Sequence, residues 1–180
     1  MANQRLTDKT ALDEQTGSGD LYMVVDVSDT TGSSSGTSKK IDSKFVIQTD
    51  KFSLSNAEVK LLETGESPKT LVTALSGYMV TPISCTVLTT ADPSDIEGSN
   101  QNLYFGFDHT QTALYWDHAS RFMSTLATNN TFIFSGGQPA KGVKTSSTIN
   151  TAFYMWSGGT GFDGGWSMDV YLTYCYTKIL

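Results

Sequence analysis

The sequence predicts an all-β protein: an antiparallel β-sandwich of jelly-roll-like form, preceded by a small N-terminal β-hairpin or extended anchor. Aromatic residues are plentiful, with 9 Phe, 8 Tyr and 3 Trp in 180 residues, and only 17% of residues are charged. Aromatic and β-branched residues favour strands. From Glu58 onward, short alternating segments recur at regular spacings between turns rich in Gly, Ser and Asn. That spacing is typical of sandwiches and barrels.

Two parts are expected along the chain, an N-terminal module over about 1–50 and a sandwich over 57–180, with residues 50–57 as a connector. In the module, Leu21–Val27 follows the turn-forming letters "TGSGD" and predicts a strand. Lys39–Ile47 predicts the return strand, so the Ser/Gly-rich tract between them becomes the mobile loop of a hairpin. A phosphate loop is excluded because no Gly-Lys-Ser/Thr and no helical pattern follow. Flanking strands also weaken the interpretation as a plain flexible linker.

The sandwich is predicted from eight alternating segments. Pro82 indicates a bulge or an edge position in the third of them, and 118–128 is the best candidate for a short helix. The last segment alternates most clearly, with apolar side chains at every second position from Trp166 to Tyr176. The eight predicted strands lie at 58–63, 70–75, 78–90, 102–108, 112–118, 131–135, 151–157 and 166–180.

The final strand carries aromatic side chains on both faces, Tyr171 on one and Tyr174 on the other. A strand that is apolar on both faces is typical of burial on both sides. In a two-layer sandwich the second cover would come from another subunit. We therefore expect a homo-oligomer, with a trimer as the closed form, and we expect Tyr171, Thr173 and Cys175 at its interface.

Charge and segment patterns limit the expected partners. The net charge of −6 argues against binding nucleic acid through its phosphates and against docking on an anionic membrane. The chain begins without an apolar leader and holds no apolar run long enough to span a bilayer. We therefore expect synthesis in a cytoplasm, with Cys85 and Cys175 reduced.

No catalytic, cofactor-binding or metal site is predicted. No G-x-S-x-G motif occurs, and neither cysteine has a basic neighbour that would lower the pKa of its thiol. The most site-like pattern is two Asp-His pairs, which could form a metal site or a pH-sensitive contact or could be surface turns. Their spacing leaves open whether they bind an ion, because a hairpin would place one pair at its turn and the other at its far end. The pairs are Asp108-His109 and Asp117-His118.

The letters "LTDKTAL…SGDLYMVVDVSDTTGSSSGTSKKID" resemble a module that recurs in virion proteins of tailed bacteriophages. The second half, with "PISCTVLTT", "LYFGFDHTQ" and "DVYLTYCYTKIL", is similar to the jelly-roll-like heads of phage fibre and decoration proteins. The resemblance implies a virion location, attachment through the N-terminus and no catalytic residues. Coiled-coil, collagen-like and triple-β-helix patterns are missing from the sequence, which favours a compact head protein over a long tail fibre.

Three functions compete on these grounds. The leading one is a non-enzymatic, homotrimeric head decoration protein or short head fibre, bound to the major capsid protein or another virion protein. Its attachment residues would be Leu21, Met23, Val25, Val27 and Ile41. The alternative is a tail fibre, adaptor or receptor-binding protein whose loops at 90–100, 136–147 and 157–165 contact host glycans. A carbohydrate-active enzyme or lectin outside any virus comes third.

Overall fold

The computed structural model describes residues 21–62, 67–92, 101–109, 113–118, 122, 129–136, 145–158, 162 and 164–179. The helix expected at 118–128 lies almost wholly outside these residues. The chain divides into two compact units, Met1–Lys44 and Phe45–Leu180. The division falls before Phe45, whereas the expected boundary is near residue 50. It comes earlier because residues 48–54 pair with residues 168–174 of the larger unit. None of the helices in the described ranges has the length and apolar character needed to cross a membrane.

The described part of the first unit is a two-stranded antiparallel hairpin. Strand β1 (Leu21–Asp26) pairs with β2 (Thr37–Asp42) in an unbroken register that runs from Leu21 opposite Asp42 to Asp26 opposite Thr37. The hairpin confirms the expected pair of arms around the Ser/Gly tract. The return arm begins earlier than predicted and ends at Asp42, where the 3-10 turn η2 (Ser43–Phe45) follows.

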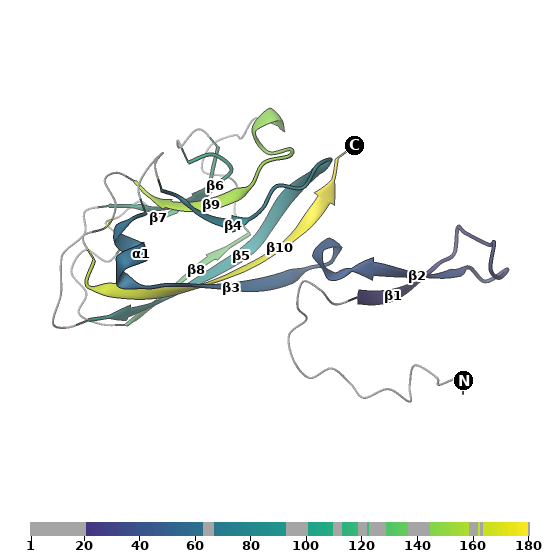
Figure 1. Cartoon of the computed structure of the whole chain (residues 1–180), viewed down its shortest axis with the longest axis horizontal. Helices are drawn as coiled ribbons and strands as arrows, with labels where there is room; N and C mark the ends of the chain where they lie inside the picture. The colour runs from purple at the N-terminus through teal and green to yellow at the C-terminus, as the bar shows by residue number, and fades with distance from the viewer. Residues whose placement is uncertain are drawn as a thin grey trace. The chain divides into compact units, whose positions relative to one another are not determined.

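The second unit is a sandwich of two four-stranded antiparallel sheets (Figure 1). One sheet has the order β3-β10-β5-β8 and the other the order β4-β9-β6-β7. The strands of the first sheet are β3 (Gln48–Leu54), β10 (Trp166–Lys178), β5 (Tyr78–Ala91) and β8 (Asn130–Ser135). The strands of the second sheet are β4 (Lys69–Val72), β9 (Phe153–Ser157), β6 (Leu103–Gly106) and β7 (Leu114–His118).

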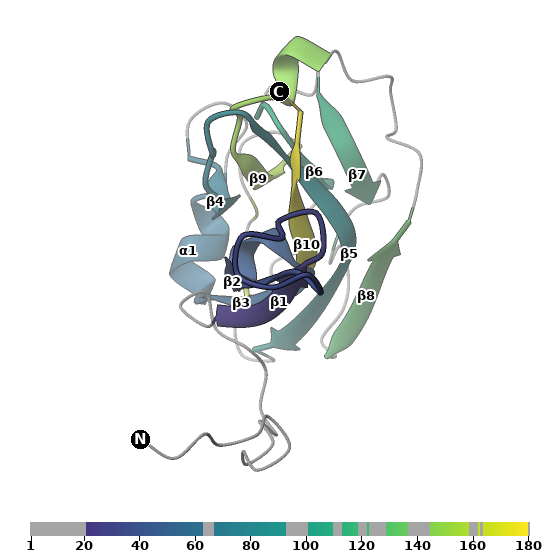
Figure 2. The same cartoon turned by 90° about the vertical axis from the view of Figure 1, so that its right-hand side faces the viewer.

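The strand order identifies the sandwich as a jelly roll. The first strand of the unit pairs with the last (β3 with β10), the second with the second-last (β4 with β9), and so on through β5 with β8 to β6 with β7. The chain is thus folded back on itself as one long hairpin, which is then rolled so that β5 also pairs with β10 and β6 with β9. Figure 2, a second view, shows β8 beyond β5 at the margin of its sheet. This topology confirms the predicted fold class.

Aromatic side chains fill the space between the sheets. Phe105 is fully buried, and its ring centroid lies 5.0 Å from that of Phe134 and 6.0 Å from that of Trp116. The Tyr115 hydroxyl donates a 3.1 Å hydrogen bond to the carbonyl of Pro82, which ties β7 to the opposite sheet. Burial of this kind explains why a chain with so many aromatic residues forms a sandwich, since each ring removes a large apolar area from water.

Strand β10 lies at the centre of its sheet, between β3 and β5. Its alternation is as predicted, because the even-numbered side chains from Trp166 to Tyr174 are buried while the odd-numbered ones are half-buried. The register with β5 shifts between Thr173 and Tyr174, opposite Pro82. The bulge expected from Pro82 is therefore confirmed, although β5 is an inner strand.

Two segments differ from the expectations. The strand expected at 58–63 is instead the short helix α1 (Asn56–Lys60). Ser55 caps its first turn, and the Glu58 carboxylate accepts hydrogen bonds from the Ser55 backbone N–H and hydroxyl at 2.9 Å, so a capping box fixes the helix start. The connector expected at 50–57 is largely strand β3, which pairs with β10.

Candidate attachment and association surfaces

The hairpin exposes an unusual number of apolar side chains for its size. Val27 is 75% exposed, Met23 65% and Val25 57%, and Val24 is exposed as well. The register places Met23 and Val25 on one face and Val24 on the other. Scattered exposed apolar residues are normal, but a hairpin that is apolar on both faces has no core of its own to bury them.

The tip of the hairpin is held by one lysine and two aspartates. The Lys39 ammonium lies 2.8 Å from an Asp26 carboxylate oxygen and 2.8 Å from an Asp29 carboxylate oxygen. These hydrogen bonds lower the pKa of Asp26, lower the pKa of Asp29 to about 2 and raise the pKa of Lys39. Lys39 is on β2 and Asp26 ends β1, so the cluster joins the two arms.

Hydroxyl groups of the Ser/Thr-rich tract complete the tip. Ser28 donates from its backbone N–H and its hydroxyl to Asp26, and Thr31 does the same to Asp29. The Thr37 hydroxyl donates a 2.7 Å hydrogen bond to the Asp29 carbonyl. Ser, Thr and Asp side chains commonly form such local hydrogen bonds with the backbone in turns. The tract is therefore a turn held by side-chain hydrogen bonds, and the mobility expected of it stays a prediction.

Gly36 allows the arms to meet beside this turn. Its φ is +109°, and a Cβ there would lie 2.7 Å from the Asp26 carbonyl oxygen. Only glycine fits such a backbone at such a distance. The repeated pattern Asp-x-Ser/Thr, at Asp26 and Asp29, is a sequence signal for this tip that the predicted loop left out.

The five predicted attachment residues do not form one surface. Met23 and Val25 share a face of β1, and Val27 follows directly after the strand. Ile41 is half-buried and pairs with Tyr22 on the opposite face. Leu21 pairs with Asp42 at the start of the strand. The structure thus brings Met23 and Val25 together on one face of β1 and places Ile41 on the other face.

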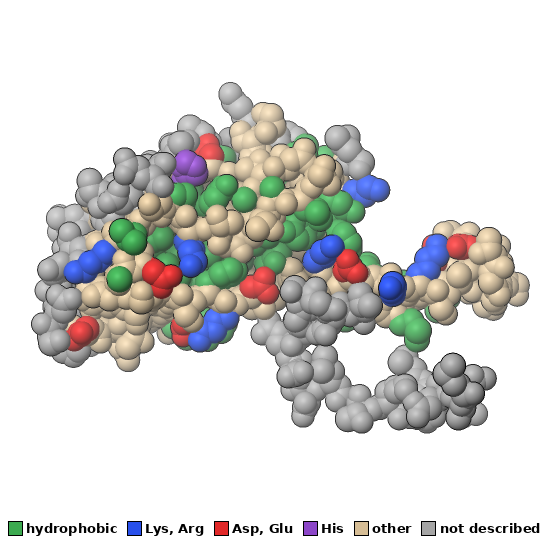
Figure 3. All heavy atoms as spheres, in the orientation of Figure 1, with side chains coloured by type: hydrophobic (Ala, Val, Ile, Leu, Met, Phe, Trp, Pro, Cys, Tyr) green, Lys and Arg blue, Asp and Glu red, His purple; other side chains and the backbone are tan. Residues whose placement is uncertain are grey.

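The three predicted interface residues lie on the outer face of β10. Lys51 Nζ is 5.5 Å from the centre of the Tyr171 ring and 2.9 Å from Asp169. The Thr173 hydroxyl is 2.8 Å from that of Thr49 on β3. Cys175 is half-buried and pairs in register with Thr81. In contrast to the expectation of an apolar second face, hydroxyl-bearing and charged residues surround Tyr171. On the face in view, Figure 3 shows charged side chains scattered among backbone and other side chains.

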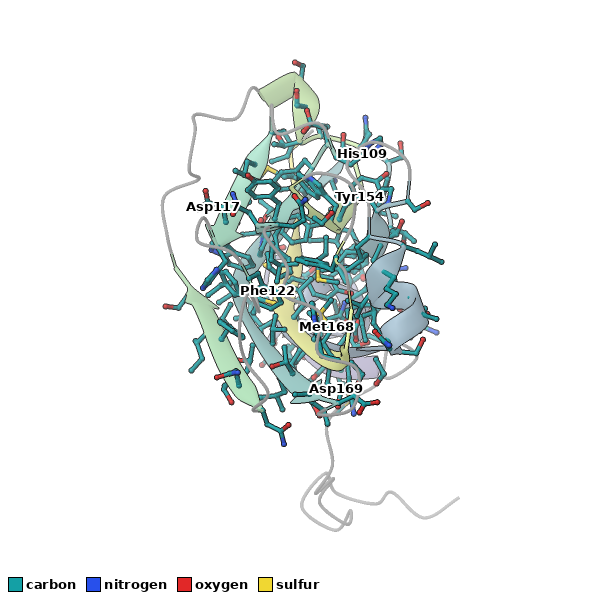
Figure 4. All side chains as sticks on the ribbon, turned by 90° about the vertical axis from the view of Figure 1, so that its left-hand side faces the viewer. His109, Asp117, Phe122, Tyr154, Met168 and Asp169 are labelled. Atoms are coloured by element: carbon teal, nitrogen blue, oxygen red, sulfur yellow. The ribbon has the colours of Figure 1, made fainter. Side chains whose placement is uncertain are left out.

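The two Asp-His pairs are held apart by the β6–β7 hairpin. Leu103 pairs with His118, which puts that histidine at the far end, while Asp108 and His109 lie beyond the end of β6. His109 packs against Tyr154 at 5.7 Å between ring centroids, and Figure 4 shows these two side by side with Asp117 well away from them. His118 packs against aromatic rings of the core. The expected separation of the pairs is confirmed.

The cysteines are free in the structure. Cys85 is fully buried, and burial raises the pKa of its thiol to about 12. A thiol with so high a pKa forms almost no thiolate and is a poor nucleophile. Among the residues that the structure describes, no three His, Cys, Asp or Glu side chains gather as a metal site would require. The loops expected to contact glycans lie for the most part outside the described residues.

Among the described residues, the features with a possible role in binding are two surfaces, one on the hairpin and one on the outer face of β10. The hairpin presents apolar strand surface held in shape by the cluster at its tip, and the jelly roll presents a polar sheet face. Comparison with protein-family models and with curated proteins finds no match to this chain.

Proposed function

We propose that this protein is a non-enzymatic structural component of a tailed-phage virion, a decoration protein or short head fibre that its N-terminal hairpin attaches to the capsid. One observation carries the proposal: the hairpin is a separate unit of the chain and exposes Met23, Val25 and Val27 to solvent. The jelly roll buries a hydrophobic core of its own. The described residues of the hairpin form no core of their own, and binding to another protein would bury their apolar side chains.

The geometry favours strand pairing at the free edge of β1. An uncharged edge strand is a template for another strand, whereas lysines on an edge discourage pairing. The run from Leu21 to Val25 carries no charge, while β2 carries Lys39 and Lys40. A capsid strand added to β1 would gain main-chain hydrogen bonds, and Met23 and Val25 would supply side-chain contacts.

The proposal includes self-association as a homotrimer, with Tyr171, Thr173 and Cys175 as contact residues. The support is that all three are half-buried on the outer face of a central strand, where another subunit can reach them. The hydroxyl groups of that face would make such an interface polar and hydrated, as many specific interfaces are.

Co-sedimentation with purified virions tests the attachment. The full-length chain should sediment with the particles, while a chain without residues 1–44 and the Val25→Asp variant should stay in the supernatant. Ser34→Asp, which adds the same charge at an exposed position of the turn, is the matched control and should still bind. Each protein is first shown by its thermal unfolding to retain the jelly roll. Binding by the shortened chain would refute attachment through the hairpin.

A further inference from the structure

Among the residues that the structure describes, the jelly roll has four edge strands, and three of them carry features that discourage pairing with other strands. β3 holds Asp50 and Lys51 at its middle. β4 has only four residues and an irregular register with β9. β7 ends in Asp117-His118, and its register with β6 is also broken. Charge, shortness and irregularity are the usual protections of a sheet edge.

The fourth edge, β8, has none of these features. Its six residues, "NTFIFS", include no charged residue and no proline, and its register with β5 is unbroken from Ser84 opposite Ser135 to Thr89 opposite Asn130. Ile133 is 71% exposed. No strand among the described residues pairs with β8 on its other side. An exposed, regular, uncharged edge of this length is a site for strand addition.

The free backbone groups of β8 can be assigned to particular residues. Asn130 donates from its backbone N–H to the Thr89 hydroxyl of β5, and the Gly136 N–H donates to the Ile83 carbonyl of β5. Successive residues of an antiparallel strand direct these groups to opposite sides. The even-numbered residues of β8 therefore face β5, and the N–H and C=O groups of Thr131, Ile133 and Ser135 point to the free edge.

The side chains of β8 are arranged symmetrically about Ile133. Phe132 and Phe134 flank it and point towards the core, and Thr131 and Ser135 follow as hydroxyl-bearing residues on the exposed face. An interface between identical subunits related by a two-fold axis must be self-complementary. A strand that reads the same in both directions meets this condition when it pairs antiparallel with itself.

We propose that β8 pairs with β8 of a second copy of this chain, antiparallel and with Ile133 on the two-fold axis. Ile133 then lies opposite its equivalent, Phe132 opposite Phe134, and Thr131 opposite Ser135, all of them favourable cross-strand pairs. In an acidic chain, like charges on the two copies could repel each other at such a contact. Because β8 has no charged residue, this repulsion does not arise within the strand pair. The two copies of the β3-β10-β5-β8 sheet join into one continuous sheet. This contact does not involve the hairpin or the Tyr171 face.

The first test measures the association of the full-length protein by analytical ultracentrifugation. In the Tyr171→Lys background, which removes the separate contact proposed for the sheet face, the chain should still form the two-fold pair. In the same background Ile133→Lys should raise the dissociation constant of that pair by about tenfold or more, because two lysines then face each other at the axis. The control is Thr70→Lys, which places the same charge at an exposed position of edge strand β4 and should leave association unchanged. Unchanged melting temperatures show that both variants fold.

The second test fixes the register by disulfide cross-linking in a Cys175→Ser background. Ile133→Cys alone should give a linked dimer under mild oxidation, since directly opposite residues have Cα atoms about 5.5 Å apart. Thr131→Cys and Ser135→Cys should not link alone but should link when the two proteins are mixed.

Three results would overturn the proposal. The first is a wild-type chain that remains monomeric at every concentration at which it is soluble. The second is association that Tyr171→Lys abolishes and Ile133→Lys leaves unchanged, which would place the contact on the sheet face. The third is cross-linking of Thr131→Cys with Ile133→Cys in place of the predicted pairs, which would place Phe132 on the axis.

Discussion

The Lys39 ammonium and the Asp26 carboxylate lie 2.8 Å apart across the two arms of the N-terminal hairpin. The same ammonium reaches Asp29 in the turn. A single side chain thus connects β2, the end of β1 and the loop between them. Because the hairpin has no core, polar contacts of this kind determine whether its apolar side chains are presented in a fixed arrangement.

Replacing Lys39 with Gln should loosen the tip of the hairpin without affecting the jelly roll. The change removes both ion pairs, and hydrogen exchange at the backbone N–H groups of Ser28 and Thr31 should become a few-fold faster, a small effect because exposed ion pairs are weak. Hydrogen exchange followed by NMR measures this. Lys40→Gln, on the opposite face of β2, is the matched control, and equal acceleration in both variants would contradict the role given to Lys39.

The tip should remain intact in mild acid. Hydrogen bonds from Lys39 hold the pKa of Asp29 at about 2 and lower the pKa of Asp26 as well. In an unfolded chain the pKa of Asp is about 3.9. A carboxyl whose pKa is lower in the folded state stabilises that state above the unfolded pKa and loses this effect as pH falls through the folded pKa. NMR titration should therefore show the turn unchanged down to about pH 4 and released as pH falls towards 2. Titration of both carboxyls near 3.9 would contradict this.

Gly36→Ala should disrupt the hairpin selectively. The residue has a positive φ, and the new methyl group would meet the Asp26 carbonyl and the Val25 side chain at less than 3 Å. The positive φ alone costs about 1 to 2 kcal/mol for a residue with a Cβ. Loss of the β1–β2 cross-strand nuclear Overhauser effects, with an unchanged melting temperature of the jelly roll, is the expected result. Ser34→Ala, at an exposed turn position, should preserve the hairpin.

The two cysteines should differ sharply in reactivity. Burial raises the pKa of the Cys85 thiol to about 12 and leaves it without access to reagents, while Cys175 is half-buried on a sheet face. A thiol reagent at pH 8 should modify Cys175 in the native protein and both cysteines in denaturant. Mass spectrometry of the labelled peptides distinguishes the two. Rapid labelling of Cys85 in the native protein would contradict the burial of this residue in β5.

Ser55→Ala should lower the stability of the jelly roll by about 1 kcal/mol, the usual effect of losing a helix N-cap. Ser55 accepts a hydrogen bond from the Glu58 N–H and donates to the Glu58 carboxylate. Urea unfolding measures the change in the free energy of unfolding. Ser76→Ala, at an exposed turn position outside α1, is the control and should be neutral.

The sequence predicts the sandwich well where burial alone decides the pattern. Strand β10 is recognised because Trp166, Met168 and Val170 alternate with polar residues and are all buried. Strand β3 was missed because its inward positions are not all apolar. Gln48 and Asp50 share the inward face of the strand with Phe52. Asp50 accepts a 2.8 Å hydrogen bond from the Tyr174 hydroxyl, a partner that no local pattern reveals.

The tip of the hairpin and helix α1 show the opposite case, in which a local sequence signal is present but competes with a second pattern. Ser55 and Glu58 have the spacing of a capping box, yet Val59 and Leu61 also fit one face of a strand. Tertiary packing decides between these, because Val59 is fully buried while Leu61 is 62% exposed. The outer-face surroundings of Tyr171 could not be predicted, since Lys51 reaches it only through strand pairing.

The rolled topology has a consequence for how the chain folds. Thr49 on the first strand of the jelly roll and Thr173 on the last are hydrogen-bonded partners separated by 124 residues, and β10 lies between β3 and β5 in the finished sheet. That sheet cannot form until the final residues of the sandwich have been synthesised, and such distant pairing is slow. The β1–β2 hairpin pairs residues that are close in the sequence, so it can form while the rest of the chain is still being made.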